Sequence, residues 1–213
     1  MIKRVVGIVV IAAIAFLGSC TSTPKVEKPQ MVKEAKPEVI DDQYHGTRET
    51  PDWVFMEPDE IAAKVKDYYV FKFMRSGKDL DGLRLWTRGF VASSEIARLV
   101  SVKVKDKFVG AAAGDKDKLE TYMEEVVKSI SKAQFSGARK KASYWWLIRK
   151  VNADGTVEEK YEYFMLYYVP KEQIDKAIQR ALEEADKKVK PKSEDEVTAR
   201  ERVKKAFETG GIE

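Results

Sequence analysis

The 213-residue chain contains one cysteine and one histidine, and this scarcity excludes several kinds of site. A single cysteine allows neither an internal disulfide nor a cysteine-rich metal site. The single histidine, His45, falls in a polar stretch where we expect it to be solvated, and no other histidine is left to act as the base of a nucleophilic triad. We therefore predict no catalytic residue, no metal site and no cofactor.

A concentration of one charge is also lacking. The 39 basic and 35 acidic residues are interleaved, and the formal net charge is only +4. Nucleic-acid binders usually carry massed basic residues, so we predict no nucleic-acid partner. The glycine- and alanine-rich run at residues 110–114 lacks the Gly-Lys-Ser/Thr ending of a phosphate-binding loop. Asp115 and Asp117 follow it, where they suit a helix N-terminus better than a Ca²⁺ site with its about six to eight oxygens.

The apolar run at residues 5–17 is too short to cross a bilayer comfortably, since spanning takes about 20 residues. It follows a basic start and precedes small residues, an order typical of a secretory signal peptide. The run leads into Leu17, Gly18, Ser19 and Cys20, which resemble the lipobox of bacterial lipoproteins. The resemblance implies that residues 1–19 are removed and that Cys20 is lipidated on its thiol and its new amine. The alternatives are an uncleaved anchor or an ordinary secretory signal with an incidental cysteine.

Residues 20–50 have few large apolar side chains and contain three prolines, Pro24, Pro29 and Pro37. Such a composition cannot bury enough apolar surface to offset the entropy of ordering the chain. Prolines also favour an extended, semi-rigid spacer. We therefore expect the lipidated cysteine to be followed by a disordered tether that holds the folded part off the membrane.

Residues 51–190 carry the patterns of one folded domain. After a short helix at 61–66, aromatic and β-branched residues predict a strand at 68–74. Apolar residues at three- and four-residue spacing predict helices over 80–109 and 115–133, with a strand at 100–104 as the alternative within the first. Two β-rich runs at 142–149 and 157–169 flank an Asn/Asp/Gly turn, which indicates a β-hairpin, and a helix begins after Pro170.

Residues 191–213 are a charged tail in which a capping-box pattern from Ser193 to Glu196 predicts a last helix over 194–208. Its apolar residues are sparse, which indicates a protruding arm or an oligomer contact. Together the patterns predict an α+β fold. Its small antiparallel sheet has about three strands with helices packed on one face, in the order β-α-α-β-β-α, and the C-terminal helix is added to it.

The order of these parts resembles the LPP-twenty family of small bacterial lipoproteins. The likeness is carried by residues 51–54 (PDWV), 92–98 (ASSEIAR) and 163–169 (YFMLYYV), within a matching stretch of about 51–184. The chain departs from the family pattern at residues 71–75, where a glycine-rich run is usual, and in its tail. Members are outer-membrane-associated lipoproteins, and some are parts of flagellar disks. The resemblance therefore implies a non-catalytic role in the cell envelope.

The predicted hairpin carries most of the aromatic side chains of the second half of the chain. On neighbouring strands half of them must face away from the helices. They either shield the open face of the sheet through cross-strand pairs or form an exposed surface for a partner or an apolar ligand. The residues of this candidate surface are Tyr144, Trp145, Trp146, Tyr161, Tyr163, Tyr167 and Tyr168.

These observations lead to two hypotheses of function. The first is a lipid-anchored structural or assembly protein of the envelope, on the outer membrane rather than the inner, with envelope or flagellar proteins or further copies of itself as partners. The second is a carrier that holds a lipid or another apolar ligand between helices and sheet, which requires a cavity of roughly several hundred Å³.

Overall fold

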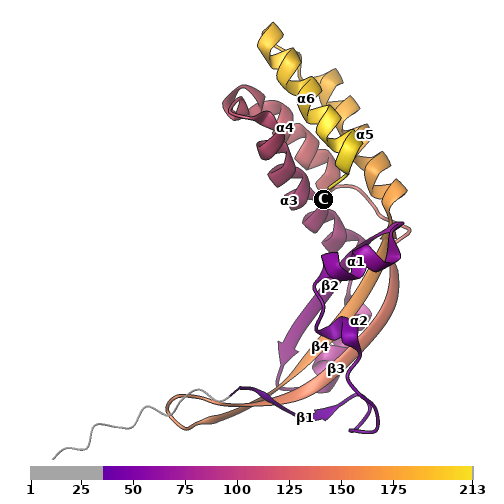
Figure 1. The fold of residues 1–213 in the computed structure, drawn as a ribbon, viewed down its shortest axis with the longest axis vertical. Coiled ribbons are helices and arrows are strands. Elements are labelled where there is room, and N and C mark those ends of the chain that lie inside the picture. Colours follow the sequence, from indigo (N-terminus) through magenta and orange to yellow (C-terminus); the bar gives the residue numbers. More distant parts are fainter. Residues whose placement is uncertain (1–35, 213) are drawn as a thin grey trace, which may run out of the picture.

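The computed structural model describes residues 36–212, which form an α+β fold (Figure 1). Within this range a four-stranded antiparallel sheet is combined with six α-helices, the last of them C-terminal, so the predicted fold class is confirmed. The predicted signal peptide, its lipobox and Cys20 lie outside the described residues. The elements are β1 (Glu38–Asp42), the 3-10 helix η1 (Asp52–Val54), α1 (Pro58–Val65), β2 (Tyr68–Gly77), α2 (Leu80–Gly89), α3 (Ala92–Ala112), α4 (Lys116–Ser131), β3 (Arg139–Val151), β4 (Val157–Pro170), α5 (Lys171–Lys188) and α6 (Glu194–Gly210).

The β3–β4 hairpin is the centre of the sheet, whose strand order is β1-β3-β4-β2. Its turn contains Gly155 at a φ of +82°, a conformation that favours glycine. Strand β2 pairs with β4 along its whole length, from Tyr68 opposite Pro170 to Gly77 opposite Tyr161. The predicted hairpin is therefore confirmed, and the end remote from its turn continues directly into α5.

Strand β1 adds a fourth strand in a segment for which the sequence predicts a tether. Glu38, Val39, Asp41 and Asp42 pair with β3 between Trp146 and Arg149. The prediction of disorder up to residue 50 is therefore wrong for this part of the chain. The strand is short and its outer residues are exposed, so its composition does not distinguish it from a spacer. Its pairing with the long hairpin supplies the stabilisation that the local sequence lacks.

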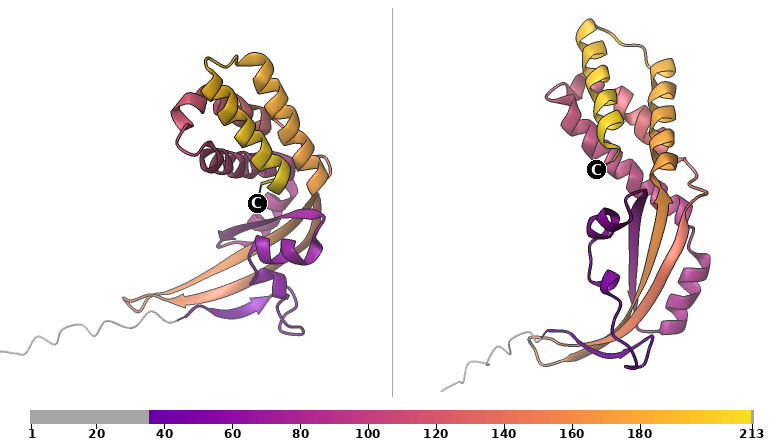
Figure 2. Two further views of the ribbon diagram at one scale, coloured as in Figure 1. Left: turned by 45° about the horizontal axis from the view of Figure 1, so that its top comes forward. Right: turned by 45° about the vertical axis from the view of Figure 1, so that its right-hand side comes forward.

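Helices α3 to α6 pack against one another at the end of the sheet opposite the hairpin turn (Figures 1 and 2). Their inward faces form the largest apolar core, which also takes in one end of the sheet. Fully buried members of that core include Val100, Val104, Phe108, Leu119, Tyr122, Ile178 and Leu182. The apolar spacing that predicts these helices is the spacing that brings their buried residues onto one side.

The stretch predicted as one helix over 80–109 is divided into α2 and α3. Helix α2 ends at Gly89, and Phe90 is extended before α3 begins at Ala92. The ring of Phe90 lies 4.8 Å from that of Phe73 on β2, so its contact with the sheet stabilises the break. The alternative of a strand at 100–104 is wrong, because these residues lie inside α3.

The helices cover both faces of the sheet, whereas the sequence predicts a single covered face. On one face Phe71 and Met165 join the core of the helical bundle, and Trp86 of α2 and Phe90 after it pack against the same core. On the other face Val70 and Leu166 pack against Ile61 of α1. Figure 2 shows α1 and α2 on opposite sides of the strands. Helix α1 has eight residues, too few for its periodicity to indicate which face it covers.

Helix α6 is part of the same core and not a separate tail. Ala199, Val203 and Phe207 are at most 3% exposed and belong to the core that α3, α4 and α5 share. The predicted division between residues 190 and 191, with a protruding arm beyond it, is therefore wrong. The predicted cap is present, since the Ser193 hydroxyl accepts a hydrogen bond from the Glu196 N–H at 3.2 Å.

Candidate functional site

The predicted aromatic surface does not form one patch. Strand alternation sends its members to two faces: Trp145, Tyr161, Tyr163 and Tyr167 to the side of α2, and Tyr144, Trp146 and Tyr168 to the side of α1. Tyr144, Trp145 and Tyr167 are less than a tenth exposed, and the other four are half-buried. This burial favours the first interpretation, in which the rings shield the sheet.

Ring contacts across the strands account for most of that shielding. The centres of the Trp145 and Tyr161 rings are 5.8 Å apart with 64° between their planes, and those of Trp146 and Phe164 are 5.1 Å apart with 82° between their planes. The Trp146 indole N–H also donates to Glu162 at 2.9 Å. Edge-to-face pairs of this kind stabilise a sheet beyond the area they bury.

Asp42 holds β1 and the following turn against the sheet. Its carboxylate is buried and accepts hydrogen bonds from the Tyr44 N–H at 2.6 Å and the Tyr144 hydroxyl at 3.0 Å, with the Gly46 N–H at 3.4 Å. Burial by itself raises the pKa of Asp42, but these hydrogen bonds outweigh it and the pKa is lowered. His45, in the same turn, is 73% exposed as expected, with Nδ1 3.0 Å from Asp41.

The lowered pKa predicts an acid-sensitive attachment of β1. Because the folded state holds Asp42 ionised more strongly than the unfolded state does, its contribution is complete above the ordinary pKa of 3.8 and is lost as the pH falls through the lower, folded value. The Asp42→Asn variant should therefore be less stable than the wild type at neutral pH, with a gap that closes below about pH 4. Denaturant unfolding across the acid range measures this, and a gap independent of pH would contradict it.

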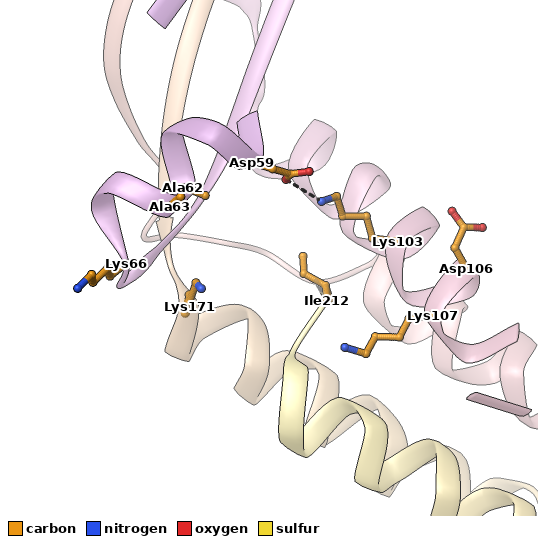
Figure 3. Close-up of a pocket in the computed structure, with 9 residues that line it drawn as sticks. All are labelled: Asp59, Ala62, Ala63, Lys66, Lys103, Asp106, Lys107, Lys171 and Ile212. Atoms are coloured by element: carbon orange, nitrogen blue, oxygen red, sulfur yellow. Dashed lines mark ion pairs between the residues drawn. The ribbon is translucent and has the colours of Figure 1, made fainter. Parts of the chain in front are cut away.

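A lysine-lined pocket lies where α1, α3, the start of α5 and the C-terminal end meet (Figure 3). It has a volume of about 760 Å³ and is lined by Asp59, Ala62, Ala63, Lys66, Lys103, Asp106, Lys107, Lys171 and Ile212. Lys103 is 3.6 Å from Asp59, and Lys107 donates to the Gly210 carbonyl at 2.8 Å.

Contacts around this pocket tie the C-terminal end to the sheet. The Tyr69 hydroxyl donates to Asp175 at 3.0 Å and accepts the Ile212 N–H at 3.3 Å. The Lys171 ammonium lies 5.3 Å from the centre of the Tyr69 ring. Several cations of the pocket therefore already interact with groups of the chain, which gives the pocket a structural role at the junction of sheet and bundle.

A second pocket, the tyrosine–cation groove, lies on the α1 side of the sheet where β3 begins and β4 ends. Its volume is about 790 Å³, and it is lined by Val65, Tyr68, Gly137, Arg139, Lys140, Lys141, Tyr168 and Pro170. The Tyr68 and Tyr168 rings are 5.7 Å apart with an angle of 36° between their planes. The lining includes three cationic side chains and no carboxylate.

Only Tyr168 of this groove belongs to the surface predicted from the sequence. Lys140 and Lys141, two of its three cations, are both exposed. Tyr68 is the first residue of the predicted strand at 68–74, and nothing in its local sequence marks it as part of a binding site. The register of β2 against β4, which places Val70 opposite Tyr168 and Tyr68 opposite Pro170, is what brings the two rings together. To find this site from the sequence, one would have had to predict which residues of β2 lie opposite which residues of β4.

The bundle contains a buried ion pair that sequence patterns do not reveal. Arg200 and Glu196, at most 5% exposed, are joined at 2.5 Å. Arg200 also donates to the Val189 carbonyl at 2.7 Å and lies 4.2 Å from the centre of the Tyr122 ring. Burial raises the pKa of Glu196, but the Lys192 N–H and Arg200 outweigh it and lower the pKa. These contacts fasten the start of α6 to α4 and α5.

Comparison with known protein families, curated proteins and solved structures finds no match to this chain. Within residues 36–212, no group of three or more histidine, cysteine, aspartate or glutamate side chains is arranged to hold a metal ion. In the same part of the chain, no helix has the length and apolar character that crossing a membrane requires.

Proposed function

We propose that this protein is a bacterial lipoprotein, anchored to a membrane of the cell envelope through Cys20, with a non-catalytic structural or assembly role carried out through protein partners. The residues Leu17 to Cys20 behind an apolar stretch supply the argument for the anchor. The outer membrane is favoured over the inner, and the resemblance to LPP-twenty lipoproteins adds envelope or flagellar proteins and further copies of the chain as partners.

The observation that carries the proposal is the place where the chain enters the fold. Strand β1 pairs with Trp146 to Arg149, in the half of β3 next to the hairpin turn, and its first residue lies nearest that turn. The helical bundle packs at the opposite end of the sheet (Figure 1). A chain anchored upstream of β1 would therefore join the fold at the sheet, at the end remote from the helical bundle, and would leave the bundle accessible to proteins.

The anchor is tested by mass spectrometry of the protein isolated from bacterial membranes. The mature chain should begin at Cys20, and its first residue should carry the added mass of acyl groups. A mature chain that begins elsewhere, or an unmodified Cys20, would contradict the proposal.

The partner role is tested by photo-crosslinking in intact cells. A photoreactive residue at exposed Lys116, at the start of α4, should give discrete protein complexes. The same residue at Val157, 59% exposed beside the hairpin turn, is the matched control and should give fewer protein and more lipid products. Absence of discrete complexes from positions on all bundle helices would count against a protein-binding role.

The second proposal is a carrier of an apolar ligand. It requires an apolar cavity between helices and sheet. The two large pockets described above instead open to the surface and carry lysine side chains. Lipid recovered from the purified protein in stoichiometric amount, apart from the acyl chains on Cys20, would favour the carrier.

A further inference from the structure

We propose that the tyrosine–cation groove binds an extended acidic segment of a partner protein. The inference rests on the proposed function, because it presumes that the protein acts through protein partners, and it adds their chemistry. Three features of the molecule favour such a partner: the charge of the groove, the open edge of β3 beside it, and the pair of tyrosine rings.

The charge of the groove is not balanced by the protein. Arg139, Lys140 and Lys141 are exposed and line it together, and none of them forms an ion pair with a residue in the described range 36–212. In the lysine-lined pocket, by contrast, Asp59 and Asp106 accompany the cations. Three adjacent cations without carboxylates attract an anionic ligand, and arginine in particular favours carboxylate groups.

The shape of the site favours an extended polypeptide. Strand β1 pairs with β3 only as far as Trp146, and one further backbone bond joins the Gln43 N–H to the Trp145 carbonyl. In the described part of the chain, the stretch of β3 from Arg139 to Tyr144 therefore has no strand on the side away from β4. An extended segment can add to such an edge in line with β1.

The cations at this edge select the kind of segment. Lysine side chains on an exposed strand edge disfavour pairing with a neutral or basic strand. A second copy of the same edge would bring like charges together. An acidic segment would instead neutralise the three cations, which makes it the occupant that this edge accepts best.

The two tyrosines supply the apolar part of the contact. Tyr68 is 39% exposed and its ring lies against that of Tyr168, with Val65 of α1 beside them. Such rings offer rigid contact area at a low cost in side-chain entropy. The segment that fits the groove therefore carries acidic residues for the cations together with apolar residues for the rings.

The test measures binding of a fluorescent peptide of alternating glutamate and valine to the full chain in detergent, by fluorescence anisotropy. We expect saturable binding that weakens as salt is added, and no binding of a peptide with glutamine in place of glutamate. Arg139→Glu, Lys140→Glu and Lys141→Glu together should weaken binding by at least about tenfold, and Tyr68→Ala should weaken it with little change in salt dependence.

The matched control changes the net charge equally at another place. Lys116→Glu, Lys190→Glu and Lys205→Glu together alter three exposed lysines of the bundle and should leave the affinity for the peptide within about twofold. Circular dichroism checks that both triple variants are folded, and Lys140→Gln alone serves as a milder substitution if the groove variant is not.

Three outcomes would overturn the inference. The first is equal loss of binding in the two triple variants, which would show a general charge effect. The second is unchanged affinity in the groove variant, which would leave the cations as protection of an exposed edge. The third is binding to vesicles of anionic lipid with none to the acidic peptide. If the peptide fails while crosslinking in cells still yields protein complexes, only the groove assignment is lost and the proposed function stands.

Discussion

Replacing Cys20 with serine is expected to abolish incorporation of radiolabelled palmitate and to leave the protein as an uncleaved precursor. The lipobox resemblance implies that lipid is added to the thiol before the signal is cut, so removal of the thiol stops both steps. Burial of acyl chains contributes about 0.8 kcal/mol for each CH₂ group, and two or more chains hold a protein on a membrane stably. The effect should therefore be all-or-none, measured by labelling and by the size of the product.

The spacing of the motif provides the control for this experiment. The double variant Cys20→Ser with Ser22→Cys still has one thiol. That thiol lies two positions further along the chain from Leu17 than it does in the wild type. We expect no palmitate label in this variant, whereas Thr21→Ala should be labelled like the wild type. Label retained in the Cys20→Ser variant would show that the anchor is elsewhere or that the cysteine is incidental.

The Glu196→Ala substitution should have the largest effect on stability, about 3 kcal/mol of unfolding free energy. It removes the main partner of a guanidinium that is only 3% exposed and leaves that charge in the interior. The Arg200 contact with Asp186 at 3.7 Å and its bond to the Val189 carbonyl remain, so the loss stays at the lower end of the range for a broken buried pair. Denaturant unfolding of the full chain measures it.

Two further variants distinguish the contribution of the ion pair to stability from that of helix α6 itself. Glu194→Ala removes an exposed carboxylate from the same turn of α6 and should cost less than about 0.5 kcal/mol. Replacing the pair together, with Glu196→Leu and Arg200→Met, should be less destabilising than Glu196→Ala alone, because no unpaired charge is left buried. Equal losses from Glu194→Ala and Glu196→Ala would mean that the buried pair contributes little.

The buried ion pair also bears on how the bundle presents its surface. Arg200 contacts residues of α4, α5 and α6 and the segment after α5, so it helps to fix the position of α6 in the bundle. If the bundle is the part that meets partners, loss of this pair should weaken partner capture as well as stability. Crosslinking from Lys116 in the Glu196→Ala variant measures the first effect separately from the second.

Local patterns in the sequence were sufficient to predict the secondary structure where it depends on residues that are near neighbours in the chain. The hairpin follows from two β-rich runs around an Asn/Asp/Gly turn, and α5 and α6 follow from a proline and a serine cap that the structure confirms. Apolar spacing likewise predicts the buried sides of α3 and α4. In each case hydrogen bonds or packing within a few residues stabilise the element, so a single stretch contains enough information.

Contacts between residues far apart in the sequence decided the position of β1 and α6 and the formation of the tyrosine–cation groove. Strand β1 exists because a long hairpin offers it an edge and because Asp42 meets Tyr144, 102 residues away. Helix α6 joins the core because Ala199, Val203 and Phe207 pack into it and Arg200 lies over the Tyr122 ring. The groove exists because Tyr68 of β2 meets Tyr168 of β4. The sequence by itself determined the helical segments, though not the break between α2 and α3, together with the hairpin and a cysteine motif that predicts a lipid anchor. Only the tertiary structure decided which faces are covered and which charges are unpaired, because these depend on register and packing between segments whose separation along the chain leaves no local pattern.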